Sequence, residues 1–240
     1  MASGGQTMFA QMHSREERLL LFRLQILICD GGLQVLRNIL DQTLTAQGLT
    51  LRACLDSEKS TITRLKSRGV ITQTQYDILF PASGQSPTTT DMDITLVICL
   101  LRSLKCFGLN KKFDWNASPT PTDLTVEADI CRLRTFRNKV SHISTAGIQR
   151  NDFLSMWNEI EQILVRRSSP AMNIHQMIAN FKCCPLDLEE DIRIQKELNE
   201  WKDYEAEVGH LKDEMTDIKT DVSRMMKHLE QIKRRQYSIF

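Results

Sequence analysis

The segment from Ile94 to Leu101 is the strongest constraint on how this chain can fold. Seven of its eight residues are apolar, so a helix built from them is hydrophobic on nearly all sides. Such a segment must be covered by protein from every direction, which predicts a central buried helix within Asp91 to Cys106. A buried strand is the competing interpretation. The pattern extends past ten residues and no hairpin partner lies nearby, and both facts favour the helix.

The other segments before residue 186 also show apolar residues at helical spacing. Gly31 and Gly32 follow Asp30 and predict a helix end, so the helices on the two sides are expected to be antiparallel neighbours. Thr72 with Gln75 forms a capping-box signal. We predict an all-α fold with a helical domain over residues 15 to 182. The expected helices are Glu16 to Cys29, Leu33 to Leu44, Leu51 to Arg68, Thr72 to Leu79, Leu124 to Ser144, Asp152 to Val165 and Met172 to Phe181.

Composition and cysteine usage limit the cellular context. The formal charge of the 240 residues is +1, which argues against a protein that binds polyanions through bulk charge. Residues 1 to 14 are small and polar, so we expect a flexible N-terminus without a secretory signal. The seven cysteines lie mostly in apolar helical stripes, which indicates reduced thiols in a cytoplasmic or nuclear protein. The longest apolar run is too short to span a bilayer, and we expect no membrane partner.

The sequence contains no motif with the spacing of a metal site. Cys183 and Cys184 are adjacent, and they lack the Cys-x-x-Cys and histidine spacing of zinc sites. We therefore expect neither a metal nor another cofactor.

A seam of apolar residues at alternating steps of three and four begins at Trp201 and continues without a break to Ile232. A seam of this length predicts a coiled coil over residues 186 to 236 and, through it, a homodimer or higher homo-oligomer. A long helix folded back on its own domain is the alternative. The seam positions are Trp201, Tyr204, Val208, Leu211, Met215, Ile218, Val222, Met225, Leu229 and Ile232.

The helix expected over residues 124 to 144 carries a charge within its apolar stripe, because Arg137 occupies the position that completes the stripe. An arginine there needs a partner, since an unpaired buried charge is costly. His142 lies one helical turn after Asn138, whose amide is therefore able to orient the imidazole. Arg132 and Arg134 are expected on the exposed face. The stripe consists of Val126, Ile130, Leu133 and Val140.

Two interpretations of Arg137 are open. In the first, Arg137 is a buried structural residue paired with Asp129 or Asp93, and His142 is a helix C-terminal residue favoured by the helix dipole. In the second, Arg137 and His142 belong to one functional site. The two residues lie about 140° apart around an ideal helix, so that site requires a frayed helix or a partner that wraps around it.

Arg137 and Asn138, followed after three residues by His142, resemble the arginine and histidine signature of HEPN domains. These are all-helical modules, many of which are metal-independent ribonucleases. Over roughly residues 15 to 180 the surroundings resemble one HEPN family, named after the DAZ-interacting zinc-finger ubiquitin ligase, without the zinc-finger part of that protein. The resembling segments are Cys29-Asp30-Gly31-Gly32 with Val35-Leu36-Arg37, Tyr76-Asp77 with Leu79-Phe80-Pro81, Asp93-Ile94-Thr95-Leu96, Asp114-Trp115, Ala128-Asp129-Ile130, and Phe153 with Trp157.

The resemblance implies a HEPN-like helical bundle, here followed by a long C-terminal coiled-coil helix. Catalytic HEPN domains commonly act as dimers, so it implies a candidate metal-independent endoribonuclease or RNA-binding protein that acts as a homodimer. In that interpretation Arg137 binds the phosphate, His142 acts as acid and base, and Asn138 fixes the imidazole. The alternative is a non-catalytic interaction module that recognises protein or RNA and is clustered by its coiled coil.

Overall fold

The computed structural model describes residues 3–82, 84–109, 112–143, 147–200, 202 and 222–226, with side chains described from residue 15 onward. The chain divides into two compact units, Met1–Lys202 and Asp203–Phe240. Within the described residues every regular element is a helix, and this confirms the predicted all-α fold.

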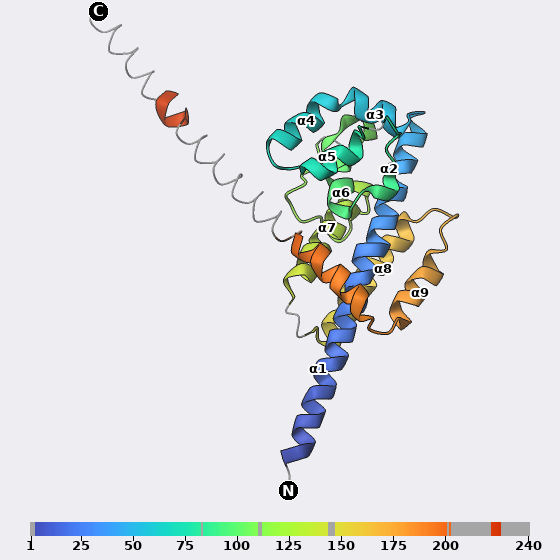
Figure 1. The fold of residues 1–240 in the computed structure, drawn as a ribbon, viewed down its shortest axis with the longest axis vertical. Helices are drawn as coiled ribbons and strands as arrows, with labels where there is room; N and C mark the ends of the chain where they lie inside the picture. The colour runs from blue at the N-terminus through green and yellow to red at the C-terminus, as the bar shows by residue number, and fades with distance from the viewer. Residues whose placement is uncertain are drawn as a thin grey trace, which may run out of the picture. The chain divides into compact units, whose positions relative to one another are not determined.

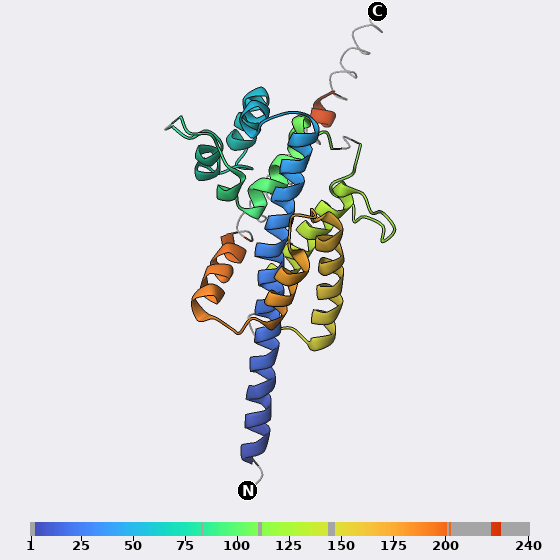
Figure 2. The ribbon, with the colours of Figure 1, turned by 90° about the vertical axis from the view of Figure 1, so that its right-hand side faces the viewer.

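One continuous helical shaft runs through the first unit (Figures 1 and 2). It consists of α1 (Ser3–Ile26), the π-helical turn η1 (Leu27–Gly32) and α2 (Leu33–Ala46). The N-terminal segment that we expected to be flexible is therefore helical from Ser3. By length and composition alone, the stretch Arg15–Ala46 is apolar enough to cross a membrane. However, 72% of its most apolar window is buried inside the bundle, as is common for core helices.

The shaft contradicts the helix end predicted at Gly31 and Gly32. Gly32 has helical backbone angles (φ −61°, ψ −46°), so the two flanking helices continue one another and are not antiparallel neighbours. A Cβ atom on Gly31 would lie 3.2 Å from Cδ1 of Leu164 and 3.4 Å from the ring of Phe181. The missing side chain at Gly31 therefore permits the close approach of two later helices, which is a packing role and not a capping role.

The remaining helices of the first unit pack around the shaft. They are α3 (Leu51–Ser57), α4 (Lys59–Ser67), α5 (Gln73–Leu79), η2 (Thr89–Asp91), α6 (Ile94–Ser103), η3 (Lys105–Phe107), α7 (Val126–His142), α8 (Arg150–Arg167) and α9 (Ile174–Cys183). The predicted central helix is confirmed, because every residue from Ile94 to Leu101 in α6 is buried. The capping box of Thr72 and Gln75 at α5 is also present. The helix expected over Leu51 to Arg68 is divided at Glu58 into α3 and α4.

A further helix over residues 188–200 belongs to the same unit. The side chain of Asp187 begins it by accepting a hydrogen bond from the backbone N–H of Glu190 at 3.0 Å. Ile194 and Leu198 are 0% and 2% exposed and form part of the hydrophobic core. The helical domain therefore extends past the boundary that we expected at residue 182.

Most of the predicted coiled-coil seam lies outside the described residues. Val222 and Met225 are in the described helical turn 222–226, where they are 46% and 59% exposed. The coiled coil, and the oligomer that it would form, stay predictions. The seam positions outside the described residues are Trp201, Tyr204, Val208, Leu211, Met215, Ile218, Leu229 and Ile232.

The cysteines differ in part from the expectation of reduced thiols. Cys54 of α3 and Cys106 of η3 form a disulfide bond between segments 52 residues apart. Cys29, Cys99 and Cys131 are buried free thiols, as the apolar stripes indicate. The disulfide was not predictable from spacing, because its two cysteines meet only where the tertiary fold brings α3 next to η3.

Candidate functional site on helix α7

Helix α7 carries the predicted site residues in its last two turns. At its start, the side chain of Thr125 accepts a hydrogen bond from the backbone N–H of Ala128 at 3.3 Å. The helix ends at His142, and Ile143 after it has an extended backbone (φ −67°, ψ 136°). The helix is thus intact through His142, and the signature residues keep the angular offset of about 140° that an ideal helix imposes.

Arg137 projects from α7 toward α6 and is only 3% exposed. Its Nη1 donates a hydrogen bond to Oγ1 of Thr95 at 3.3 Å, and its Nε and Nη2 donate to Oδ1 of Asn138 at 3.0 and 2.8 Å. Cys29 of η1 is nearby: burial and then Glu197 raise the pKa of its thiol, whereas the charge of Arg137 acts in the lowering direction. The guanidinium therefore lies in the interior, as the apolar stripe predicts.

The prediction that Asp93 or Asp129 pairs with Arg137 is wrong, because both carboxylates have other partners. Asp93 begins α6, where its side chain accepts hydrogen bonds from the backbone N–H of Leu96 and from the amide of Gln75, each at 2.8 Å. Asp129 lies eight residues before Arg137, which is about 12 Å along the helix axis. On α6 it is the hydroxyl of Thr95, two residues after Asp93, that reaches the guanidinium.

Asp129 instead binds three arginines at the other end of α7. Its side chain is 0% exposed and lies 2.8 Å from Arg132, 2.8 Å from Arg166 and 2.7 Å from Arg167. Burial acts to raise the pKa of Asp129, but hydrogen bonds from Arg166 and Arg167 outweigh it, so the pKa lies below its ordinary value. This cluster joins α7 to the end of α8. It also corrects the expectation that Arg132 is exposed, because its side chain is only 15% exposed.

His142 lies on the other side of α7, where α7 and α8 border an open groove of about 870 Å³. His142 is exposed, and half-buried Asn138 lines the same groove. Arg137 does not line it. The structure thus brings Asn138 and His142 into one groove. Asn138 also contacts the guanidinium, because its Oδ1 accepts hydrogen bonds from Arg137, but the guanidinium itself does not line the groove.

The two walls of the groove carry opposite charges. The α7 wall contains Arg134, Lys139 and His142, whereas the α8 wall contains Asp152 and Glu159. Our sequence interpretation missed the acidic wall. The signal for it was the spacing of seven residues between Asp152 and Glu159, which places both carboxylates on one face of a helix.

One end of the groove is fixed to the shaft. The backbone N–H of Ile148 donates to the carbonyl of Glu17 at 3.1 Å, and the amide of Gln149 donates to the carboxylate of Glu17 at 2.6 Å. Gly147 has φ +129°, and a Cβ atom on it would lie 2.5 Å from the backbone carbonyl carbon of Glu17. Only glycine fits this close contact between the loop and α1.

A family model described as DZIP3/hRUL138-like HEPN matches residues 48–190, which is more than half of the chain. The chain belongs to this HEPN family. No curated protein and no solved structure matches it. The family match covers α3 to α9 and the first turn of the 188–200 helix, whereas the resemblance in the sequence extended from residue 15.

The described part of this HEPN chain has no group of three His, Cys, Asp or Glu residues suited to hold a metal ion. Cys183 is exposed, and its half-buried neighbour Cys184 has a thiol that donates to the carbonyl of Phe181 at 3.0 Å. Burial raises the pKa of Cys184, so its thiolate form is disfavoured. The groove beside the HEPN signature is therefore the strongest candidate for a functional site among the described residues.

Proposed function

We propose that this HEPN domain is a non-catalytic interaction module, clustered into a homo-oligomer by its C-terminal coiled coil. The burial of Arg137 carries the proposal. A catalytic arginine must reach the phosphate whose developing charge it stabilises. Arg137 is 3% exposed, and its guanidinium donates to Thr95 and Asn138 of its own protomer. To reach a substrate it would have to leave these partners and vacate a buried position, which costs several kcal/mol.

The chemistry of RNA cleavage also limits what the exposed residues can do by themselves. Internal attack requires a base for the 2′-hydroxyl proton, an acid for the leaving 5′ oxygen and a cation on the phosphate. His142 supplies one acid–base group per protomer. The groove beside it contains Asp152 and Glu159, whose carboxylates repel a phosphate backbone.

A metal-independent endoribonuclease is the second candidate, and the exposure of His142 beside Asn138 favours it. In that mechanism two copies of His142 across a two-fold axis act as base and acid. Asn138 fixes the imidazole, and Arg137 moves out of the core to bind the phosphate. The 2′-hydroxyl requirement would restrict the reaction to RNA.

Cleavage of a labelled structured RNA in the presence of a metal chelator tests the two candidates. The full chain would be compared with Arg137→Ala, His142→Ala and, as a matched control, His175→Ala, which removes an exposed histidine from α9. We expect no cleavage by any of the four proteins. Cleavage by the wild type and by His175→Ala that is lost in folded Arg137→Ala and His142→Ala would contradict the proposal.

The clustering part of the proposal needs a separate measurement. Light scattering after size-exclusion chromatography should give a mass that is a multiple of the 27.7 kDa chain. Leu211→Glu, at a seam position, should make the protein monomeric, because a charged side chain at that position disrupts the apolar packing of a coiled coil. A wild-type protein with the mass of one chain would contradict clustering.

A further inference from the structure

The groove between α7 and α8 combines features that suit one kind of occupant. Asp152, Met156 and Glu159 follow one another at steps of four and three along α8. Opposite them, Lys139 and His142 form an exposed basic edge on α7. Half-buried Ile143 and Met156 also line the groove, which therefore presents apolar surface together with the opposite charges of its two walls.

The length of the groove sets the length of its occupant. Seven residues separate Asp152 from Glu159 and eight separate Arg134 from His142, so the walls are about 10 and 12 Å long. Two to three turns of an α-helix span that length, and a helix placed on a pair of helices buries one apolar stripe between its own two polar edges.

We propose that this groove docks an amphipathic helix of a partner protein, with acidic residues along the edge that faces α7 and basic residues along the edge that faces α8. The inference rests on the proposed interaction function and names its partner class. A nucleic acid is disfavoured, because phosphates along the groove would meet Asp152 and Glu159. A uniformly basic or acidic peptide would meet one repulsive wall.

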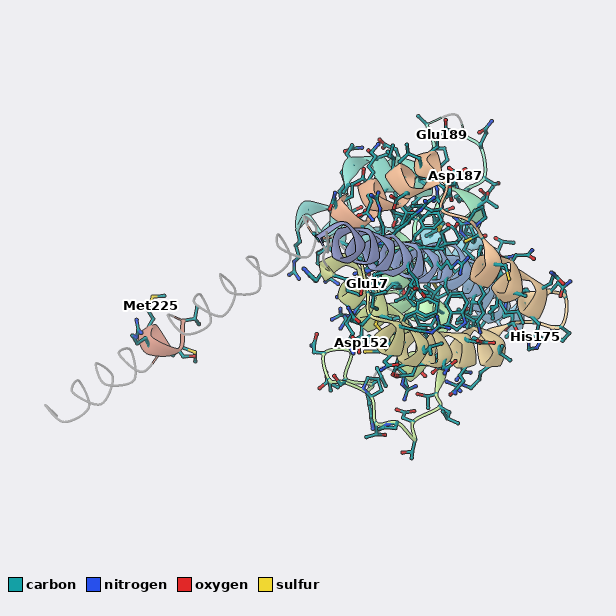
Figure 3. The ribbon with its side chains drawn as sticks, turned by 90° about the horizontal axis from the view of Figure 1, so that it is seen from below. Glu17, Asp152, His175, Asp187, Glu189 and Met225 are labelled. Atoms are coloured by element: carbon teal, nitrogen blue, oxygen red, sulfur yellow. A yellow bond between two sulfur atoms is a disulfide. The ribbon has the colours of Figure 1, made fainter. Side chains whose placement is uncertain are left out.

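The groove is formed before any partner arrives. The contacts of Ile148 and Gln149 with Glu17 join its end to α1, and Gly147 packs directly against the backbone of Glu17. When a site is already formed, binding costs little free energy for ordering its side chains and loops. Figure 3 shows Asp152 near Glu17, toward the middle of the bundle in this view, and Glu189 at the upper edge, so Glu189 provides a control position for a charge reversal.

Three fluorescent helical peptides of 14 residues, each with the same leucine stripe, are the probes. The mixed probe has glutamate along one edge and lysine along the other, the acidic probe has glutamate on both edges, and the basic probe has lysine on both edges. Fluorescence anisotropy with the full chain should show the mixed probe binding about fivefold more tightly than either other probe, since a rim charge pair contributes up to about 1 kcal/mol.

Charge reversal in the chain then identifies the two walls. Glu159→Lys should weaken the mixed probe about fivefold and favour the acidic probe, while Lys139→Glu should weaken the mixed probe similarly and favour the basic probe. Both positions are exposed, so the variants should fold as the wild type does, and thermal unfolding checks this. Glu189→Lys should leave all three affinities unchanged.

The peptide measurements would overturn the inference if they gave equal affinity for all probes, equal effects of Glu159→Lys and Glu189→Lys, or no saturable binding up to about 1 mM. Displacement of the mixed probe by a labelled single-stranded RNA would likewise overturn it and assign the groove to nucleic acid. If the probes do not bind, the proposal of a non-catalytic function is not contradicted, because that proposal is tested by the RNA cleavage assay and not by peptide binding.

Discussion

The two faces of α7 differ in what they offer to a ligand. On the face toward α6 and η1, Arg137 is sealed in the core and donates its hydrogen bonds within the protomer. On the face toward α8, Asn138 and His142 border an open groove. A sequence signature therefore does not by itself place its residues in one cleft. Five positions along a helix separate Arg137 from His142 by enough rotation to place them on different faces.

The largest loss of stability should come from the buried ion-pair cluster around Asp129, near the start of α7. Asp129→Ala leaves Arg132, Arg166 and Arg167 without their shared carboxylate, and breaking a buried ion pair in this way costs about 4 kcal/mol of unfolding free energy. Urea unfolding measures the change. Asp152→Ala, on the open face, should change the free energy by less than about 1 kcal/mol. Similar losses in both variants would mean that the two faces do not differ as described.

A smaller loss is expected where the groove meets the shaft. Gly147→Ala places a Cβ atom 2.5 Å from a backbone atom of Glu17 at φ +129°, so the loop must move, at a cost of about 2 kcal/mol. Gly84→Ala is the matched control, because Gly84 has φ +72° with nothing within 4 Å, and backbone strain alone costs about 1 kcal/mol. Thermal unfolding compares the two. Equal losses would show that the contact with Glu17 does not fix the groove.

The 188–200 helix should make the stability depend on pH. Burial is the main cause that raises the pKa of Glu197 from near 4.5 to about 7, with Asp30, Asp93 and Glu200 also raising it and Arg193 opposing them. A carboxyl group with a raised folded-state pKa destabilises the fold as pH rises from 4.5 through 7. Glu197→Gln should therefore be more stable than the wild type by about 1 kcal/mol above pH 7, after allowance for solvent screening.

The same comparison should vanish about one pH unit or more below 4.5, where Glu197 is protonated in both the folded and the unfolded chain. The difference in melting temperature between Glu197→Gln and the wild type, recorded from about pH 3.5 to about pH 8, checks the sign. A difference that shrinks as pH rises would contradict the raised pKa.

The smallest effect is expected at His142. The side chain is exposed at the end of α7, so His142→Ala should change the free energy of unfolding by less than about 0.5 kcal/mol. Arg137→Ala should cost about 3 kcal/mol, because it empties a buried position and removes the partner of Thr95. Urea unfolding of the two variants side by side gives the contrast directly. A loss at His142 that equals the loss at Arg137 would place His142 in the core.

Local signals predicted the elements that local physics determines. The central helix was predictable because its apolar residues must be covered by protein on all sides. The capping box was predictable because Thr72 and Gln75 lie within one helical turn of each other. The burial of Arg137 followed from its place in the apolar stripe. In each case the residues that carry the sequence pattern are the same residues that form the predicted feature, or lie within a few positions of it.

Contacts between distant residues were not predictable in this way. Gly31 looked like a helix end because its true role, the approach of Leu164 and Phe181, is set more than 100 residues later in the chain. Asp129 was one of two possible partners considered for Arg137, whereas Arg166 and Arg167 bind it from the end of α8. The groove was missed for the same reason, since its two walls come from different helices.

The π-helical turn in the shaft amounts to one residue inserted into an otherwise continuous helix. One residue more or less rotates everything after it by about 100°, so α1 can face α7 and α9 while α2 faces α3 and α6. Deletion of a single residue within Leu27–Gly32 should therefore destabilise the fold more than most substitutions in the core. It would turn the whole of α2 about its own axis and carry Leu36 and Leu40, both fully buried, away from the neighbours that cover them.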